Sequence, residues 1–277
     1  MERVVRDDIG NVLRNIDVDQ FSYVIICLNR LDGSCFIKCI KDSDSLDTAV
    51  QEIRSKGIYG MISVEVISGP DSNFDSHEKN ISEEAFKYAC SMHEGQYRKD
   101  GTPYINHPIR VANYVSSYYK NSINKDILIA SAYLHDTLED TSTTYHELLN
   151  LFGGQIAGLV LELTSDNDIK EYLGKTKYLE IKMMNMSELA LFIKLCDRLD
   201  NVSDLTTSDE KFRNKYVKET LEILEFLLSN RKLSETHISV IKNILNNLIK
   251  CKFQCECVEP EVDKLNCKVK QLSLALQ

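Results

Sequence analysis

A short apolar run that ends in a cluster of ionisable side chains constrains this chain more than any other feature. Residues 127–134 are mostly apolar and predict a buried helix, and His135, Asp136, Glu139 and Asp140 follow directly. If the helix continues, His135 shares a face with Glu139, and Asp136 shares a neighbouring face with Asp140, because residues four apart align. This spacing predicts a metal hydrolase in which His135 and Asp136 bind the metal while Glu139 and Asp140 handle water and protons.

The composition excludes several classes of function. The 277 residues are 43% apolar and 27% charged, which suits one large globular domain or two smaller ones. A net charge of −9 argues against nucleic-acid or anionic-membrane partners but allows a small anionic substrate in a local basic pocket. No run reaches the ~20 apolar residues of a membrane span, and residues 1–8 are no signal peptide, so a cytoplasmic location is expected.

The nine cysteines are expected to be reduced thiols. Several lie within apolar runs, where a free cysteine behaves as a small hydrophobic residue, and no secretory signal is recognised. Cys251, Cys255, Cys257 and Cys267 could suggest a zinc site, but they lack a paired C-x-x-C, so the reading without metal is favoured.

Residues 1–75 predict a small α+β module. Residues 21–28, 35–40 and 61–67 have the β-rich composition of strands, and 43–54 has the apolar spacing of a helix. The order is therefore β-β-α-β, and residues 69–73 have the composition of a linker. The module contains no catalytic cluster, so its expected roles are interaction, dimerisation to a homo-oligomer, or ligand sensing.

Residues 76–277 predict an all-helical domain, which makes the fold class mainly α. Ser82, Thr143 or Thr144, and Ser187 are candidate N-caps, and Pro108 suits the first position of a helix. A helix is expected to end at Gly153, and two amphipathic helices are expected over 209–229 and 234–252. Residues 165–174 are expected to be a polar connection, and 258–277 to be weakly helical.

Two distant residues can complete the metal site. His107 precedes Pro108, and Asp197 lies between apolar residues, where a carboxylate is costly to bury unless it is paired or metal-bound. Asn201 is one helical turn beyond Asp197 and faces the same way. With His135 and Asp136 these residues form a mixed nitrogen and oxygen site that suits Mn²⁺ or Fe²⁺ better than Zn²⁺ or Mg²⁺.

Each of these residues also has a simpler interpretation. A histidine before proline is usually a loop residue, and a His-Asp pair is common by chance. Asp197 followed by Arg198 could be a helix ion pair, and Glu139 with Asp140 could be a solvated helix end. The simple interpretations do not explain the joint order of these residues along the chain.

Several spaced motifs carry that order. They are Ala89-x3-His93-x-Gly95-Gln96-x-Arg98-Lys99-x-Gly101-x-Pro103-Tyr104-Ile105-x-His107-Pro108, Leu134-His135-Asp136-Thr137-x-Glu139-Asp140-Thr141, and Lys194-Leu195-x-Asp197-Arg198-Leu199-x-Asn201. In sequence and order they resemble the HD hydrolase domain of the RelA/SpoT alarmone enzymes, especially the small alarmone hydrolases, over roughly residues 82–228.

The resemblance implies specific roles. It implies that His107, His135, Asp136 and Asp197 are the metal ligands and that the metal is typically Mn²⁺, with other divalent ions as alternatives. Glu139 and Asp140 would position and activate water. Arg98 and Lys99 would flank the base and phosphates of a nucleotide, and Asn201 would bind its ribose or phosphate region.

The family removes the 3′-pyrophosphate from guanosine tetra- or pentaphosphate, (p)ppGpp, to give GDP or GTP in the stringent response. Some animal-type members also remove the 2′-phosphate of NADPH. The resemblance therefore implies (p)ppGpp hydrolysis, with NADPH or another nucleotide as the alternative substrate and no synthetase activity. A non-catalytic nucleotide sensor is the rival, but such a protein would be expected to have lost some ligands.

The chain departs from the family pattern at two points. Ser203 and Asp204 stand where the long bifunctional enzymes usually carry Arg and Thr. The residues 1–75 module is not part of the hydrolase pattern. Lys175 and Lys177 are further candidates for phosphate contacts, although lysines on a helix are usually a solvated face.

Overall fold

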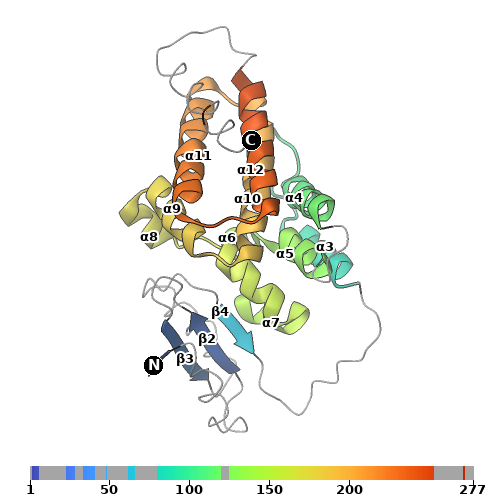
Figure 1. Ribbon diagram of the computed structural model, residues 1–277. Helices are drawn as coiled ribbons and strands as arrows, with labels where there is room; N and C mark the ends of the chain where they lie inside the picture. The colour runs from blue at the N-terminus through green and yellow to red at the C-terminus, as the bar shows by residue number, and fades with distance from the viewer. Residues whose placement is uncertain are drawn as a thin grey trace.

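The computed structural model describes residues 80–119 and 125–252, four strands at 2–5, 23–28, 34–40 and 62–65, and the single positions Thr48 and Gln271. From residue 80 to 252 the described chain is helical throughout apart from its turns and one isolated bridge (Figure 1). The all-helical domain expected from the sequence is therefore confirmed in this region.

The helices follow one another with short connections. They are α3 (Ile81–Met92), α4 (Asn106–Tyr118), α5 (Lys125–Leu134), α6 (Thr137–Asp140), α7 (Tyr145–Leu163), α8 (Asn167–Leu173), α9 (Lys175–Asn185), α10 (Glu188–Ser203), the short 3₁₀ helix η4 (Asp204–Thr207), α11 (Glu210–Asn230) and α12 (Glu235–Lys252).

Side-chain caps explain several helix starts. Thr144 caps α7 through a capping box in which it accepts from the N–H of Glu147 while the Glu147 carboxylate accepts from the N–H of Thr144. Ser187 caps α10 by accepting from the N–H of Ala190. At Gly153 the backbone of α7 leaves helical geometry at φ 78°, where a residue without Cβ is favoured, as the sequence predicted.

Two expectations about helix starts and one about a connection between helices were wrong. The N-cap of α3 is Asn80, and Ser82 instead donates to its side chain. Helix α4 begins at Asn106, so Pro108 lies further into the first turn, where its missing N–H is still tolerated because those N–H groups have no intrahelical partner. Residues 167–173 form α8, which begins where the Asp166 side chain accepts from the N–H of Ile169.

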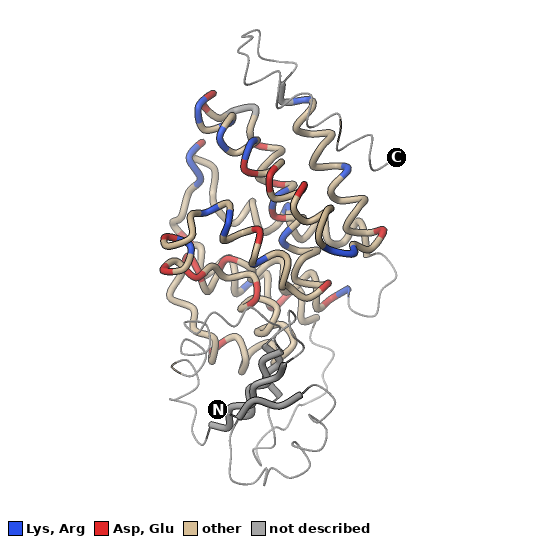
Figure 2. The backbone as a smooth tube through the Cα atoms, turned by 60° about the vertical axis from the view of Figure 1, so that its left-hand side comes forward, with Lys and Arg blue, Asp and Glu red and all other residues tan. Residues whose placement is uncertain are grey.

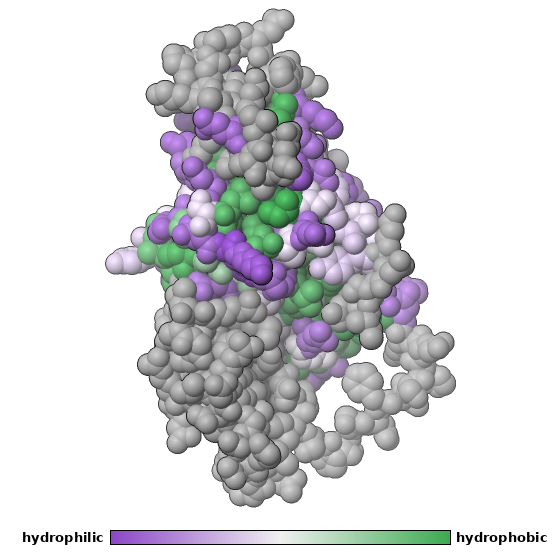
Figure 3. Space-filling view, in the orientation of Figure 1, coloured by the Kyte–Doolittle hydropathy of each residue, from purple (hydrophilic) through white to green (hydrophobic). Residues whose placement is uncertain are grey.

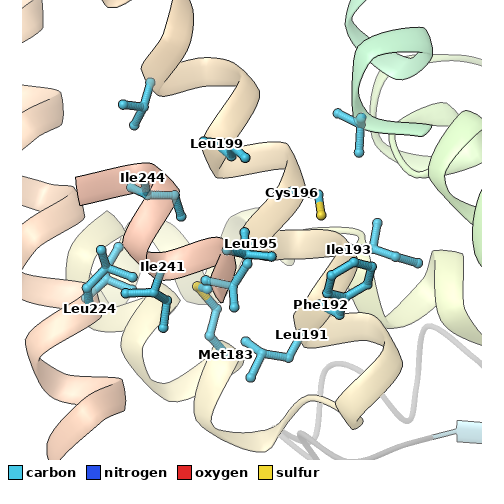
Figure 4. Packing of buried hydrophobic residues seen from close by; sticks show 14 of the residues in the cluster. Met183, Leu191, Phe192, Ile193, Leu195, Cys196, Leu199, Leu224, Ile241 and Ile244 are labelled. Carbon is cyan, nitrogen blue, oxygen red and sulfur yellow. The ribbon is translucent and has the colours of Figure 1, made fainter. Parts of the chain in front are cut away.

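Helix α10 forms the centre of the larger hydrophobic core. Leu191, Phe192, Ile193, Leu195 and Leu199 are buried and pack with residues of α4, α9, α11 and α12. Figure 4 shows these α10 side chains beside labelled residues of the neighbouring helices. Full burial of one such side chain stabilises the fold by roughly 1.5–3 kcal/mol, so this packing fixes where the polar positions of α10 lie.

A second, smaller core joins α3, α5 and α7. One helical stretch among the described residues, Tyr145–Leu173, is long and apolar enough to cross a membrane by length and composition alone, contrary to the sequence expectation. Yet 61% of the most apolar 18-residue part of this stretch is buried. Leu148, Phe152, Ile156 and Val160 belong to this smaller core. A core helix of a globular domain meets the same criterion.

The surface of the helical region mixes both signs of charge. Lys and Arg alternate with Asp and Glu along the described helices (Figure 2). Figure 3 shows hydrophilic residues gathered across the middle of one face, with hydrophobic patches beside them. The mixed charges along the helices in Figure 2 are unlike the broad basic surface that nucleic-acid binding requires.

The four strands form one antiparallel sheet in the order β1-β3-β2-β4, from β1 (Glu2–Val5), β2 (Tyr23–Leu28), β3 (Ser34–Ile40) and β4 (Ile62–Glu65). Strand β4 lies beside α7 (Figure 1). The helix expected at 43–54 and the segment 258–277 lie outside the described residues, apart from Thr48 and Gln271. Cys255, Cys257 and Cys267 also lie outside them, whereas Cys251 lies in the last turn of α12.

His237 joins the start of α12 to the start of α10. Its Nε2 lies 3.0 Å from the carbonyl oxygen of Glu188, and its Nδ1 lies 2.6 Å from the Ser234 hydroxyl. A carbonyl can only accept, so Nε2 carries the proton and Nδ1 accepts from Ser234. Burial lowers the pKa of His237, and the Arg231 charge lowers it further, which outweighs the raising effect of Glu188.

This arrangement predicts a pH-dependent contribution to stability. Because the folded pKa is lowered, the contribution of neutral His237 is complete above the unfolded pKa and is lost as pH falls through the folded pKa. Replacing His237 with Gln should cost about 1–3 kcal/mol near pH 7.5, and the cost should shrink near pH 5.5. Urea unfolding of both proteins at the two pH values measures this, and a cost that grows on acidification would contradict it.

Candidate active site

Three separate helical segments bring the predicted metal ligands together. His107 lies in the first turn of α4, His135 and Asp136 form the turn between α5 and α6, and Asp197 lies in the middle of α10. All but Asp136 are buried, and the side chain of Asp136 is 15% exposed. The packing of α4, α5 and α10 in one core therefore holds together ligands that are distant in sequence.

The structure corrects the local geometry of the opening motif. Helix α5 ends at Leu134, and α6 begins anew at Thr137, so His135 and Glu139 do not share one continuous helical face. The hydroxyl of Thr137 donates to the carbonyl of Leu134 and satisfies one acceptor at the end of α5. The turn lets the consecutive side chains of His135 and Asp136 face the same point, which a straight helix would prevent.

The ligand atoms converge closely. The Nε2 of His107 lies 3.2 Å from Oδ1 of Asp197 and 3.6 Å from Oδ2 of Asp136. The Nε2 of His135 lies 2.9 Å from the same Asp136 oxygen and 4.0 Å from Oδ1 of Asp197. One ligand atom from each of His107, His135 and Asp197 lies within 4.8 Å of the others.

The nitrogen and oxygen atoms present fit a divalent metal. Although Nε2 of His135 is buried and only 2.9 Å from Asp136, it forms no hydrogen bond among the described residues. The Nε2 of His135 and Oδ2 of Asp136 are therefore close together without a hydrogen bond between them, as two ligands of one metal ion would be. Two imidazoles and two carboxylates are also a donor set that suits divalent transition metals.

Charges within the cluster reinforce one another. Burial lowers the pKa of His107, but hydrogen bonds with Asp197 and Asp200 outweigh it and raise this pKa to about 9. Burial raises the pKa of Asp197, but the charge of Lys194 and the contacts with the histidines hold it well below its usual range. The carboxylates are therefore ionised, as metal ligands must be.

Second partners fix the orientation of each ligand. The Nδ1 of His135 lies 2.8 Å from the carbonyl of Ala132, and the Nδ1 of His107 lies 2.6 Å from Oδ2 of Asp200. Asn201 donates to Oδ1 of Asp197 at 2.6 Å. With each Nδ1–H donated away from the cluster, both histidines turn Nε2 toward its centre, and a metal that bound there would displace the proton of His107.

A cavity of about 480 Å³ opens over the cluster. Its basic lining residues are Arg98, Lys99, Lys170, Lys175, Lys194 and Arg198, and its acidic ones are Asp100, Asp136, Glu139, Asp140, Asp197 and Asp204. Tyr97, Tyr104, Phe212 and Tyr216 add aromatic surface. This volume falls in the range of small-ligand sites.

The predicted substrate residues line this cavity. Arg98 donates to Asn201 at 2.9 Å and to Asp200 at 3.2 Å, so it is held by acidic and amide groups at the cavity wall. Lys99 lies 4.4 Å above the ring of Phe212. Lys175 also lines the cavity, whereas Lys177 pairs with Glu180 and is not among the lining residues.

Glu139 and Asp140 line the cavity in different environments. Glu139 accepts from the N–H of Ser165 at 2.8 Å and lies 3.4 Å from Lys170. Burial raises the pKa of Glu139, but that hydrogen bond and the nearby lysines outweigh it and keep the pKa low. Burial and the charge of Asp136 instead raise the pKa of Asp140.

Sequence reasoning missed two groups at the site. The Tyr104 hydroxyl donates to Asp136 at 2.6 Å and lies 3.0 Å from Asp140, so it links a predicted metal ligand to one of the two residues predicted to handle water. Lys194 forms a 2.8 Å ion pair with Asp197, and three carboxylates raise its pKa although burial lowers it. The three-residue spacing of Lys194 and Asp197 on one helix was the available signal.

Asp200 and the pair Phe212 and Tyr216 were also missed. Asp200 has no exposed side-chain surface and binds three basic groups. Phe212 and Tyr216 stack at 5.9 Å between ring centroids and are one turn apart on α11. The spacing of Phe212 and Tyr216 could have suggested a shared face, but nothing in the sequence places α11 over the cavity.

The chain matches the family model described as an HD domain over residues 85–232. It is 38% identical over 161 residues to the guanosine-3′,5′-bis(diphosphate) 3′-pyrophosphohydrolase of Aquifex aeolicus, covering 55% of this chain and 21% of that enzyme. It is 40% identical over 124 residues to the Homo sapiens enzyme of that name, MESH1, covering 44% of this chain and 68% of MESH1.

A solved structure is also similar to this chain. It is described as a metazoan orthologue of SpoT that hydrolyses ppGpp, and it superposes with a TM-score of 0.52 at 25% identity, covering 65% of this chain and 97% of that one. The chain belongs to the HD domain family. The resemblance to RelA/SpoT-type hydrolases read from the motifs is confirmed by these relatives.

Lys194 supplies positive charge that a metal ion could replace. Replacing it with Met leaves Asp197 without its lysine partner and should destabilise the protein without added metal by about 3 kcal/mol. Added Mn²⁺ should recover part of the loss, because the ion restores positive charge beside Asp197 and Asp136. Thermal unfolding with and without Mn²⁺ measures both effects.

The control for this prediction is Lys175→Met. Lys175 also pairs with a carboxylate, Glu219, at 3.2 Å, but its side chain is 49% exposed, so its loss should cost less than about 1 kcal/mol. If Mn²⁺ restores none of the stability lost in Lys194→Met, the link between this lysine and the candidate metal site is contradicted.

Proposed function

We propose that this chain hydrolyses the 3′-pyrophosphate of guanosine 3′,5′-bis(diphosphate), ppGpp, or of pppGpp, giving GDP or GTP and pyrophosphate. One observation carries the proposal: two histidines and two aspartates from α4, the α5–α6 turn and α10 converge under a cavity with six basic side chains. The relatives named as (p)ppGpp hydrolases supply the substrate class.

His107, His135, Asp136 and Asp197 would hold the metal. We assign Mn²⁺, since mixed imidazole and carboxylate donors suit it, and other divalent ions are alternatives. A bound divalent ion lowers the pKa of water and offsets negative charge on phosphoryl oxygens. Lys194 and Asn201 act on Asp197, and Tyr104 acts on Asp136, so these residues keep the carboxylates oriented.

Arg98, Lys99 and Asn201 would contact the nucleotide. Arg98 and Lys99 lie on the cavity wall, where their cationic groups can donate to phosphate oxygens, and Lys99 lies over the ring of Phe212. The stacked rings of Phe212 and Tyr216 supply a flat apolar surface that suits a purine. Lys170 and Lys175 extend the positive charge around the opening.

Glu139 and Asp140 would handle the attacking water. The water oxygen forms a bond to phosphorus, the bond from phosphorus to the ribose 3′-oxygen breaks, and that oxygen ends with a proton. The lowered pKa keeps Glu139 ionised, so its carboxylate can accept a hydrogen bond from the water and then its proton. The raised pKa of Asp140 and its contact with Tyr104 suit a partner that shares the proton.

The remaining organisation is part of the proposal. Residues 1–75 would form an α+β module and residues 76–277 the hydrolase domain. Support comes from the family match, which begins at residue 85, and from the four described strands, which all precede residue 66. The module would serve interaction or homo-oligomer formation, since the described catalytic cluster lies wholly within α4 to α10.

A product assay tests the function. The purified chain with Mn²⁺ is incubated with ppGpp and, side by side, with NADPH, and pyrophosphate and phosphate release are followed. Pyrophosphate from ppGpp is the expected result. Phosphate from NADPH alone would make the chain an NADPH 2′-phosphatase, and release of neither product despite tight ppGpp binding would make it a nucleotide sensor.

Asp136→Ala should lose metal and activity together. The substitution removes the oxygen that lies 2.9 Å and 3.6 Å from the two histidine Nε2 atoms. Turnover should fall at least about 100-fold, with Mn²⁺ content falling in parallel. The matched control is Asp126→Ala, an acidic residue in the first turn of α5. Full Mn²⁺ occupancy in Asp136→Ala would refute the ligand role.

Glu139→Gln should separate metal binding from turnover. The amide can still accept from the N–H of Ser165 but can no longer take a proton from water. The variant should keep Mn²⁺ and the KM for ppGpp, while kcat falls about 100- to 10,000-fold. Steady-state kinetics with parallel metal analysis measure this, and a fully active variant would remove Glu139 from the mechanism.

A further inference from the structure

Asp200, beside the candidate active site, contacts three basic side chains. Its side chain is fully buried on α10, and its Oδ2 lies 2.6 Å from Nδ1 of His107. The same oxygen accepts from Arg98 at 3.2 Å, and Arg110 binds both oxygens, with distances of 2.6 Å and 3.0 Å. One carboxylate is thus shared by an imidazole and two guanidinium groups.

The partners of Asp200 point in different directions. His107 turns its other nitrogen, Nε2, toward the predicted metal ligands Asp197 and Asp136. Arg98 lines the cavity in which an anionic ligand would lie, whereas Arg110 is not among the lining residues. Asp200 therefore connects a candidate metal ligand to a candidate anion-binding residue, although it does not itself line the cavity.

Arg110 keeps Asp200 in place independently of Arg98. Its Nε and Nη2 both donate to Asp200, and Nη2 also donates to Asp204 at 2.7 Å. If an anion draws Arg98 away, this two-point contact still fixes the carboxylate against His107. The change reaching His107 is then mainly electrostatic, because Asp200 loses one neutralising cation without losing its position.

We propose that Asp200 is a positioning residue that couples metal binding to anion binding. By accepting from Nδ1–H of His107, Asp200 keeps the Nε2 lone pair directed at the cluster and increases its basicity. When an anion engages Arg98, the charge that Asp200 presents to His107 increases, and metal affinity rises. Linkage requires the reciprocal effect, so bound metal strengthens anion binding. The inference rests on the proposed function only in placing metal and anion in this one site.

The test measures Mn²⁺ affinity on the full chain, without substrate or turnover. Asp200→Asn should weaken Mn²⁺ binding about tenfold or more, because the amide is a weaker acceptor for His107. Arg98→Met should instead tighten Mn²⁺ binding several-fold, because Asp200 is then less neutralised. Calorimetric titration or the electron paramagnetic resonance signal of free Mn²⁺ reports both values.

The double variant supplies the decisive comparison. In the Asp200→Asn background, Arg98→Met should no longer tighten Mn²⁺ binding, since the shared carboxylate is gone. A purely structural role for Asp200 cannot produce a tightening that depends on its charge. Lys99→Met is the matched control, because it removes the adjacent cavity cation, which contacts Phe212, and should leave Mn²⁺ affinity within about twofold.

The outcomes are distinct. Wild-type Mn²⁺ affinity in Asp200→Asn, or equal effects of Arg98→Met and Lys99→Met, would overturn the coupling. If Asp200→Asn does not fold by circular dichroism, the comparison of Arg98→Met with Lys99→Met decides alone. A chain that shows the predicted affinities but leaves ppGpp intact upholds the coupling and refutes the proposed function, and the reverse result refutes the coupling only.

Discussion

The rest of the helical domain depends on the burial of ionised carboxylates within a packed core. Asp197 and Asp200 lie on α10, which also carries the central apolar side chains of the larger core. A buried carboxylate is tolerated only when cations and hydrogen-bond donors surround it. Lys194, Arg110, His107 and His135 meet that requirement, and they come from α4, the turn between α5 and α6, and α10. The packing of these helices therefore also supplies the cations and hydrogen-bond donors that the buried carboxylates need.

Helix α10 divides its faces between these two tasks. Leu191, Leu195 and Leu199 follow the spacing of one apolar face, while Lys194 and Asp197 lie on the side that borders the cavity. A shift of the helix by one residue would bring Cys196 or Arg198 to the position of Asp197, and Lys194 or Cys196 to the position of Leu195. The apolar packing of α10 thus determines the register of the site as well as the stability of the fold.

The sequence allowed most helices and the whole predicted ligand set to be named, because these depend on local spacing and on residue types with few alternative uses. The geometry between helices could not be read in this way. Glu139 was placed on a common face with His135, whereas the chain turns after Leu134 and starts a new helix. Asp200 was passed over because its partners His107 and Arg110 are 93 and 90 residues away. Only the packing of α4 against α10 reveals why that carboxylate is buried.

The balance of charge in the cavity explains how an acidic chain could bind the anionic nucleotide that we propose as its substrate. The lining residues include as many carboxylates as basic groups, so the cavity without metal has no strong positive potential of its own. Lys194 and Arg98 are already engaged by carboxylates. A divalent ion at the histidines would tip this balance toward positive charge at the point where phosphates must lie. Anion binding and metal binding would then depend on each other electrostatically, and Asp200 contacts a residue of each site, Arg98 and His107.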